Sequence, residues 1–294
     1  MRMNLKQSSV VGSPLSVAGL PVAFCLLLTA FCLVPAAWAQ EAAPAAAQTA
    51  TEAAATQAAK PAASTEAGPR MDAKSKELLD KVIQALGGQA FLNYKTVSST
   101  GRAFSIYEGE TTGFAPFESD TVPPDKRRFA YGKGQKVILV NNGSRGWQQD
   151  RYGLIRQKPE SVRRWQISMR YSLEGVLRHI VREPGALILD GGTDFVDLLP
   201  VRVLEISDSH QVNVKLDLQK STYLPTRITY RIQNPRSREW TEYAESYSEY
   251  REIQGIQTPM RMVRYVDGER VAEYFLSTVE YNKEFPPGYF QPRR

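Results

Sequence analysis

The stretch QKVILVNNGSRGWQQD, residues 135–150, contains two short runs of strand-forming residues on either side of Asn142-Gly143. An Asn-Gly pair accepts the positive φ angles of a type I′ turn, which joins neighbouring antiparallel strands. The stretch therefore predicts a β-hairpin, with strands near 135–141 and 145–150.

The same alternation of apolar and polar residues extends in both directions from this hairpin, beginning at about Thr96. Further strands are expected near 97–107, 111–118, 126–132, 153–157, 186–190, 193–198, 201–207, 211–218, 225–233, 239–250, 257–266 and 270–280. Glycine, proline, asparagine and aspartate mark the turns between them, as at Pro123-Pro124 and Asp267-Gly268. Such short connections favour antiparallel pairing, because parallel strands need a longer crossover.

Two segments have helical spacing instead. Leu78, Leu79, Val82, Ile83 and Leu86 predict a first helix that is capped by Asp72 or Ser75 and ends at Gly87-Gly88. Ser161 to Arg182 predicts a second helix with an apolar stripe, stopped by Pro184-Gly185.

These elements predict a mainly β fold of the α+β type. We expect a curved antiparallel sheet, or unclosed β-barrel, with the N-terminal helix and an inserted lid-like helix on its concave side. Such a sheet leaves an apolar cavity between its two layers.

The N-terminal residues have the order of a secretion signal. A basic start is followed by an apolar run from Val17 to Val34 and by Ala37-Trp38-Ala39, so residues 1–39 are expected to be removed after Ala39. The alternative is a retained membrane anchor formed by residues 15–37. Residues 40–70 are rich in alanine and proline and are expected to form a disordered tether. The folded domain is then expected to span residues 71–294, in the periplasm.

Charge and chemistry exclude several classes of function. A net charge of +6 without a basic stripe makes nucleic acid a poor partner; the excess fits either a solvated surface or attraction to anionic lipid head groups. Both cysteines, Cys25 and Cys32, lie in the apolar run. The two histidines, His179 and His210, do not stand at metal-ligand spacing with other histidines or with carboxylates. We therefore expect no catalytic residue, no metal and no cofactor.

Several phrases of the sequence resemble a known family when they are taken in order. They are LGGQAF (86–91), NGSRGW (142–147), KLD (215–217), YLPTR (223–227) and SEYREIQGIQTP (248–259). Together they resemble the LolA/LolB-like superfamily of periplasmic lipoprotein and lipid carriers, in the branch of outer-membrane lipoprotein-sorting proteins. The resemblance implies an unclosed barrel with helices over a hydrophobic cavity, a role in transport and outer-membrane biogenesis, and no catalysis.

On this basis we expect a non-catalytic carrier or binding protein for a lipid, a lipoprotein acyl chain or another apolar ligand. Its cavity is predicted to be lined by Phe104, Leu139, Trp147, Trp165, Met169, Leu173, Val176, Leu177, Ile180, Tyr265 and Phe275, with Arg163 and Arg164 near a head group. The aromatic residues also fit ordinary core filling. Two alternatives stay open: an envelope scaffolding module with a filled core that binds an envelope protein, and a hydrolase with a non-standard site.

Overall fold

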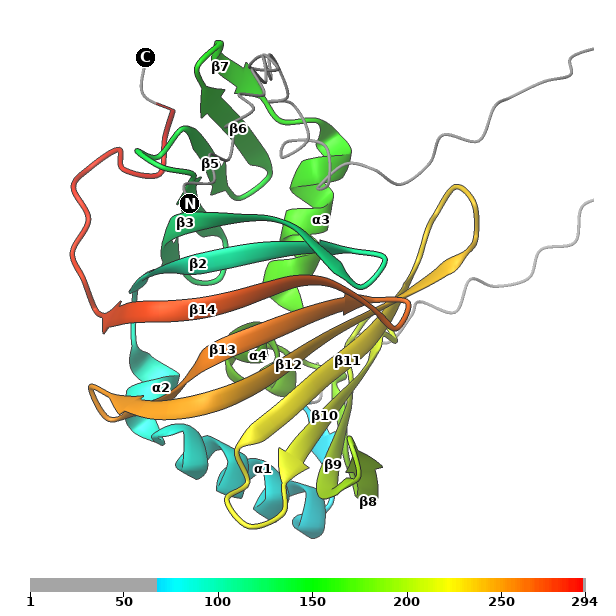
Figure 1. Cartoon of the computed structure of the whole chain (residues 1–294). Helices are drawn as coiled ribbons and strands as arrows, with labels where there is room; N and C mark the ends of the chain where they lie inside the picture. Colours follow the sequence, from blue (N-terminus) through cyan, green and yellow to red (C-terminus); the bar gives the residue numbers. More distant parts are fainter. Residues whose placement is uncertain (1–67, 293–294) are drawn as a thin grey trace, which may run out of the picture. The chain divides into compact units, whose positions relative to one another are not determined.

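A single antiparallel sheet of 14 strands forms the body of the protein in a computed structural model, which describes residues 68–292. The strands follow the order β1-β8-β9-β10-β11-β12-β13-β14-β2-β3-β4-β5-β6-β7 (Figure 1). The expected hairpin is present, since Asn142 at the end of one strand pairs with Arg145 at the start of the next. The predicted fold class is confirmed.

The strands have the following bounds: β1 Arg70–Met71, β2 Val97–Tyr107, β3 Glu110–Val122, β4 Lys126–Tyr131, β5 Val137–Asn142, β6 Arg145–Asp150, β7 Gly153–Arg156, β8 Leu187–Val196, β9 Leu199–Ser207, β10 Asn213–Gln219, β11 Pro225–Gln233, β12 Trp240–Ile253, β13 Ile256–Val266 and β14 Glu269–Tyr281. The strands β7 and β1 are the two edges of the sheet, so the sheet curves without closing into a barrel. Strand β1 was not predicted; its pairing with β8 is parallel.

Helices occupy the concave side of this sheet. Helix α1 (Ala73–Leu86) begins at Asp72, whose carboxylate accepts a 2.7 Å hydrogen bond from the Ser75 amide, as an N-cap should. It ends at Gly87, where φ is +120° and an added Cβ would lie 2.2 Å from the Gly255 carbonyl oxygen. A short helix that was not expected, α2 (Gln89–Asn93), follows.

The prediction of one helix over 161–182 is wrong. The segment forms α3 (Pro159–Arg170), α4 (Leu173–Arg178) and a 3-10 turn, Ile180–Arg182. Ser172 ends the first helix and caps the second, because its hydroxyl accepts a hydrogen bond from the Gly175 amide. An added Cβ at Gly175 would lie 2.2 Å from the Arg170 carbonyl oxygen, so only glycine permits this close reversal.

The break expected between strands 186–190 and 193–198 is also wrong, because β8 runs through it. The two glycines at 191 and 192 make a bulge between Asp190 and Gly192 instead of a turn. Gly191 is the extra residue of β8, and the pairing of β8 with β9 continues on both sides of it.

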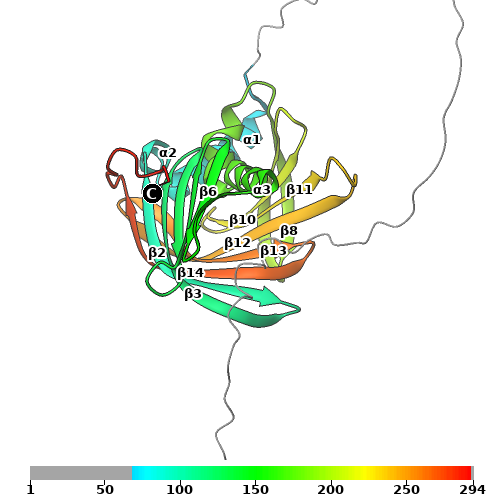
Figure 2. The same ribbon diagram turned by 90° about the horizontal axis from the view of Figure 1, so that it is seen from above.

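The main core lies where α1 and α4 pack on the sheet. Its most deeply buried members come from these helices and from β8 to β11: Val82, Leu86, Val176, Leu177, Ile188, Leu204, Ile206, Leu216 and Ile228. Helix α3 lies within the curve of the sheet (Figure 2), but Val162 is the one residue of α3 that is buried.

No helix in residues 68–292 combines the length and apolar character needed to cross a membrane. The expected signal peptide, the alternative anchor at 15–37 and most of the expected tether lie outside the described residues.

Substitution of Leu177 by alanine tests the packing of α4. Leu177 is 0% exposed, so its removal leaves a cavity and should lower the free energy of unfolding by about 2–5 kcal/mol. Chemical denaturation measures this change. Leu198→Ala is the matched control, since Leu198 is 92% exposed and its loss should leave stability nearly unchanged. Equal effects of the two substitutions would contradict the packing described.

Candidate functional site

The concave face can be followed across the sheet by strand register. Tyr247 lies opposite Met262, Met262 opposite Tyr274, and Tyr274 opposite Ala103. Residues directly opposite each other in antiparallel strands point to the same face. Tyr247 and Met262 contact the core that contains the helices, so all four residues lie on the concave side.

An apolar wall continues this face over β14 and β2 to β5. We call this set the apolar wall: Ala103, Ala115, Phe117, Phe129, Tyr131, Val137, Leu139, Tyr274 and Leu276. Its aromatic rings are in contact, with ring centroids 5.4 Å apart for Phe117 and Phe129 and 5.8 Å apart for Phe117 and Tyr274. Phe129, Leu139 and Tyr274 are only half-buried.

Polar groups stand beside the apolar wall on the same face. Arg264 donates from Nε to a Glu245 oxygen at 2.9 Å, and the Tyr247 hydroxyl donates to the other Glu245 oxygen at 3.0 Å. Arg127, two residues before Phe129, donates from Nε to the Ser119 hydroxyl at 3.0 Å. The concave side is therefore not uniformly apolar, in contrast to the cavity expected from the sequence.

These polar side chains are enclosed by protein and still accessible. Burial is the largest influence on the pKa of Arg127, Arg264 and Glu174. Nevertheless, 38% of the Arg264 side chain is exposed, and Arg127 and Glu174 are only half-buried. We use the name hollow for this part of the concave face, where Arg127, Glu174, Glu245 and Arg264 stand beside the apolar wall.

The charges in the hollow influence one another. Burial, and then the positive charge of Arg264, lowers the pKa of Arg127 to about 10. For Arg264 burial acts in the same direction, but Glu245 outweighs it and raises the pKa of that guanidinium. Burial raises the pKa of Glu174, which lies on α4, and so favours its neutral form.

Before Arg170, helix α3 makes few polar contacts with the rest of the described structure. Gln166 donates to the Gly143 carbonyl of the β5–β6 hairpin at 3.2 Å, and Glu160 lies 4.0 Å from Arg236 in an exposed pair. The indole Nε1 of Trp165 is buried with no acceptor among the described residues. Near the N-terminal end of the helix, Val162 is buried.

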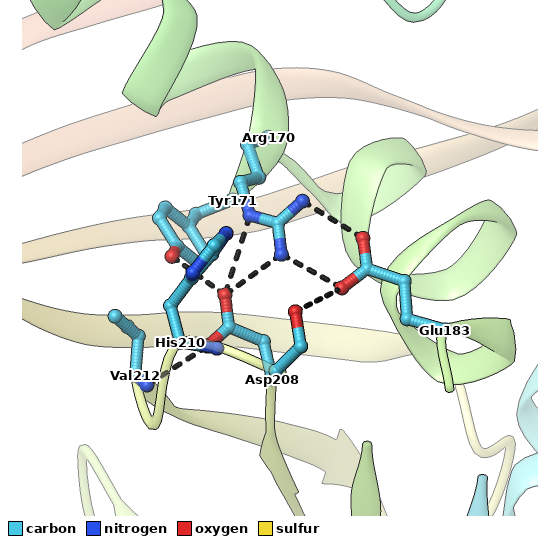
Figure 3. A network of polar contacts seen from close by, with 7 residues as sticks. Arg170, Tyr171, Glu183, Asp208, His210 and Val212 are labelled. Atoms are coloured by element: carbon cyan, nitrogen blue, oxygen red, sulfur yellow. Dashed lines mark hydrogen bonds and ion pairs between the residues drawn. The ribbon is translucent and has the colours of Figure 1, made fainter. Parts of the chain in front are cut away.

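The other end of α3 is anchored by a polar network (Figure 3). Arg170 makes two hydrogen bonds to Glu183, of 2.8 and 2.7 Å, and also donates to Asp208 at 2.9 Å. Asp208 is fully buried and accepts further bonds from the Tyr171 hydroxyl and from the backbone amides of His210 and Val212. The junction between α3 and α4 is thereby fixed to the β9–β10 turn.

The network sets the ionisation of its central carboxyl group. Burial alone would raise the pKa of Asp208, but the Val212 amide, Arg170 and Tyr171 together hold it below its ordinary value of 3.8. Asp208 is therefore a carboxylate at neutral pH, with its charge matched by Arg170.

Among residues 68–292, no group of three or more histidine, cysteine or carboxylate side chains is placed to hold a metal ion. The carboxylates of the hollow contact arginine and tyrosine, and the network at Asp208 is a closed set of hydrogen bonds. The arrangement can bind and orient a ligand that has an apolar part.

Comparison with known proteins gives similarities of structure. No family model matches the sequence, and no curated protein is similar to it. A DUF1329 family protein from Desulfovibrio piger superposes with a TM-score of 0.51 at 12% identity, over 74% of this chain and 97% of that chain. A putative outer membrane lipoprotein-sorting protein domain from Vibrio parahaemolyticus has a TM-score of 0.47 and 10% identity, and a LolA superfamily protein from Nitrosomonas europaea has 0.46 and 13%; both cover 74% of this chain and 97% of their own.

The chain shares its fold with the DUF1329 family protein. At 12% identity the similarity concerns the fold alone.

The fold separates the predicted cavity residues into three groups. Leu139 lies on the apolar wall, and Trp165 and Met169 are half-buried on α3. Leu173, Val176, Leu177 and Ile180 are packed in the main core. Phe104, Trp147, Tyr265 and Phe275 lie on the convex face; Phe104, for example, pairs with Phe114, which is 67% exposed. The head-group candidates Arg163 and Arg164 are exposed on α3.

Sequence reasoning missed the polar residues of the hollow. Arg127 stands in a basic run, Lys126-Arg127-Arg128, in which alternate residues of one strand point to opposite faces. Arg127, Phe129 and Tyr131 share the concave face, while Arg128 lies over the ring of Tyr289 on the convex face. The alternation was visible in the sequence, but which face is concave was not.

Substitution of Asp208 by asparagine should weaken the anchor of α3. Loss of the charge that Arg170 faces should lower the free energy of unfolding at pH 7 by about 2–4 kcal/mol. Because the folded-state pKa of Asp208 is lowered, its contribution is present above pH 3.8 and is lost as the pH falls below that value. Melting temperatures of the wild type and the variant should therefore converge in strong acid.

Asp194→Asn is the control for this prediction. Asp194 also pairs with a cation, Lys215, but its side chain is 52% exposed and solvent screens the pair. A gap between wild type and Asp208→Asn that stays constant from pH 7 to pH 2 would contradict the role of the Asp208 charge.

Proposed function

We propose that this chain is a non-catalytic binding or carrier protein that holds a lipid, a lipoprotein acyl chain or another apolar ligand in the hollow. The observation that carries the proposal is the apolar wall, on which Phe129, Leu139 and Tyr274 stay only half-buried on the concave side of the sheet. Apolar surface that a protein keeps accessible inside its fold is a usual place for a hydrophobic ligand.

The difference in burial between two parts of the concave side supports this proposal. Where α1 and α4 cover the sheet, residues such as Leu204 and Leu216 are 0% exposed. No helix residue belongs to the cluster of the apolar wall in the described part of the chain, and α3 contains a single buried residue. An acyl chain between α3 and the wall would bury the apolar area that the helix leaves accessible, at roughly 25 cal/mol per Å².

We propose a periplasmic location, reached with the signal sequence at 1–39 and its cleavage after Ala39. The charged and aromatic surface of the folded part is compatible with exchange of ligand at a membrane or with an envelope protein. Proteins of the LolA-like type have a similar architecture, and this analogy supports a role in carrying an apolar ligand.

A second candidate is an envelope scaffolding module that binds another protein. It is favoured by the tip of the β8–β9 hairpin, where Phe195, Leu198 and Leu199 are 68%, 92% and 68% exposed. Exposed apolar residues that lie together mark interaction surfaces. In a pull-down from envelope extract, the wild type should recover a partner protein in a one-to-one ratio. Loss of that partner with the Leu198→Ser variant would support this function.

Binding of an uncharged probe, N-phenyl-1-naphthylamine, tests the carrier function. Leu139→Gln places a polar amide on the apolar wall and should weaken binding by about tenfold or more, since the amide must be desolvated by the ligand. Probe fluorescence during titration measures the affinity. Leu189→Gln, at an exposed leucine of β8, should bind like the wild type. Absence of probe binding to the wild type would contradict the proposal.

A further inference from the structure

The guanidinium of Arg127 lies in the hollow without a carboxylate bonded to it among residues 68–292. Arg127 has two contacts, the Ser119 hydroxyl at 3.0 Å and the face of the Phe129 ring at 4.9 Å. The ion pairs among residues 68–292 do not include it. A hydroxyl and an aromatic ring leave most of the donors of a guanidinium without a strong acceptor.

The neighbouring carboxylates do not fill this role. Glu245 is held on one oxygen by Arg264 at 2.9 Å and on the other by the Tyr247 hydroxyl at 3.0 Å. Glu174, on α4, acts on Arg127 through its charge but makes no ion pair with it among the described residues. Arg127 therefore keeps guanidinium donors that no carboxylate accepts in the described part of the chain, next to the apolar wall.

Helix α3 adds another donor without an acceptor. Trp165 on α3 has its indole Nε1 buried and unpaired in the described part of the chain. Buried polar groups are nearly always hydrogen-bonded, so the indole N–H of Trp165 is a donor that an added oxygen acceptor would satisfy. The guanidinium of Arg127 prefers an oxygen anion for the same chemical reason.

We propose that Arg127 is the head-group site of the hollow, and that the ligand is an amphiphile with an acidic group, a carboxylate or a phosphate monoester, inserted toward Arg127. Its hydrocarbon chain lies along the apolar wall, beginning at Phe129, the next inward-facing residue of β4. This inference rests on the proposed function and adds the chemical class of the ligand. It differs from a head group held at the rim by Arg163 and Arg164, which are exposed on α3.

Paired ligands that differ only in the head group test the proposal. Oleate is compared with oleyl alcohol, and dodecyl phosphate with dodecanol, by displacement of N-phenyl-1-naphthylamine from the full mature chain at pH 7. The wild type should bind an acid about 10- to 100-fold more tightly than the matching alcohol, the factor expected for hydrogen bonds to a charged group. The carboxylate and phosphate arms show which of the two acids is preferred.

Arg127→Met should remove this preference and leave the affinity for the alcohols unchanged, because the methionine keeps the apolar volume without the charge. Arg127→Lys should restore a preference for the acids. Arg128→Met is the matched control, since the adjacent arginine lies on the convex face, bonded to Gln135 and placed over Tyr289. It should behave like the wild type, and so should Arg163→Met.

Thermal unfolding separates ligand binding from a structural role. Arg127→Met removes a partly desolvated charge that has no carboxylate bonded to it, so its melting temperature should equal or exceed that of the wild type. A lower melting temperature together with an unchanged acid preference would overturn the proposal. So would a loss of the preference in Arg163→Met but not in Arg127→Met. If no acid and no alcohol binds the wild type, the proposed function fails; if acids and alcohols bind equally well, only the head-group site fails.

Discussion

A sheet of 14 strands must cover its concave face, and the helices of this chain cover only part of it. Where α1 and α4 pack on β8 to β11, the side chains are fully buried and the core is closed. Over β14 and β2 to β5, Phe129, Leu139 and Tyr274 stay half-buried on the same face. This unequal cover defines the hollow, and the other features of the candidate site depend on it.

The polar contacts of α3 are concentrated at its C-terminal end. There Arg170, Tyr171, Glu183 and Asp208 form a network of charged hydrogen bonds around a fully buried carboxylate. Before Arg170 the side-chain contacts are a bond from Gln166 to Gly143 and an exposed charge pair of Glu160, while Val162 is buried. The network therefore fixes the junction of α3 with α4 to the β9–β10 turn.

Much of the fold could be predicted from the sequence because its signals are local. Asn142-Gly143 indicated the hairpin, Asp72 and Gly87 marked the ends of α1, and the alternation of residues gave most strands within two or three positions. The break between α3 and α4 depends on the close approach of Gly175 to a carbonyl of the preceding helix, and β1 depends on pairing with a distant strand. The pairing of β1 is with a distant strand, so the local pattern contains no sign of it. The break is local, and its sign in the sequence is the cap residue Ser172, which the helical spacing of the apolar residues concealed.

The candidate site was less predictable for the same reason. A half-buried strand shows which residues share a face, but the position of the helices decides which face is concave. Phe104 and Phe275 therefore looked equivalent to Phe117 and Phe129, although they lie on opposite sides of the sheet. Leu177 and Ile180 looked like cavity lining because a helical stripe is the same whether it meets a core or a ligand.

A crystal structure of the full mature chain with a fatty acid brominated at its end tests the account most directly, because the anomalous signal of bromine locates the chain without interpretation of weak density. The account predicts a bromine beneath α3, within contact distance of side chains of the apolar wall. Bromine on the convex face beside Phe104 and Phe275, or an interior filled by side chains with no bromine in it, would contradict it.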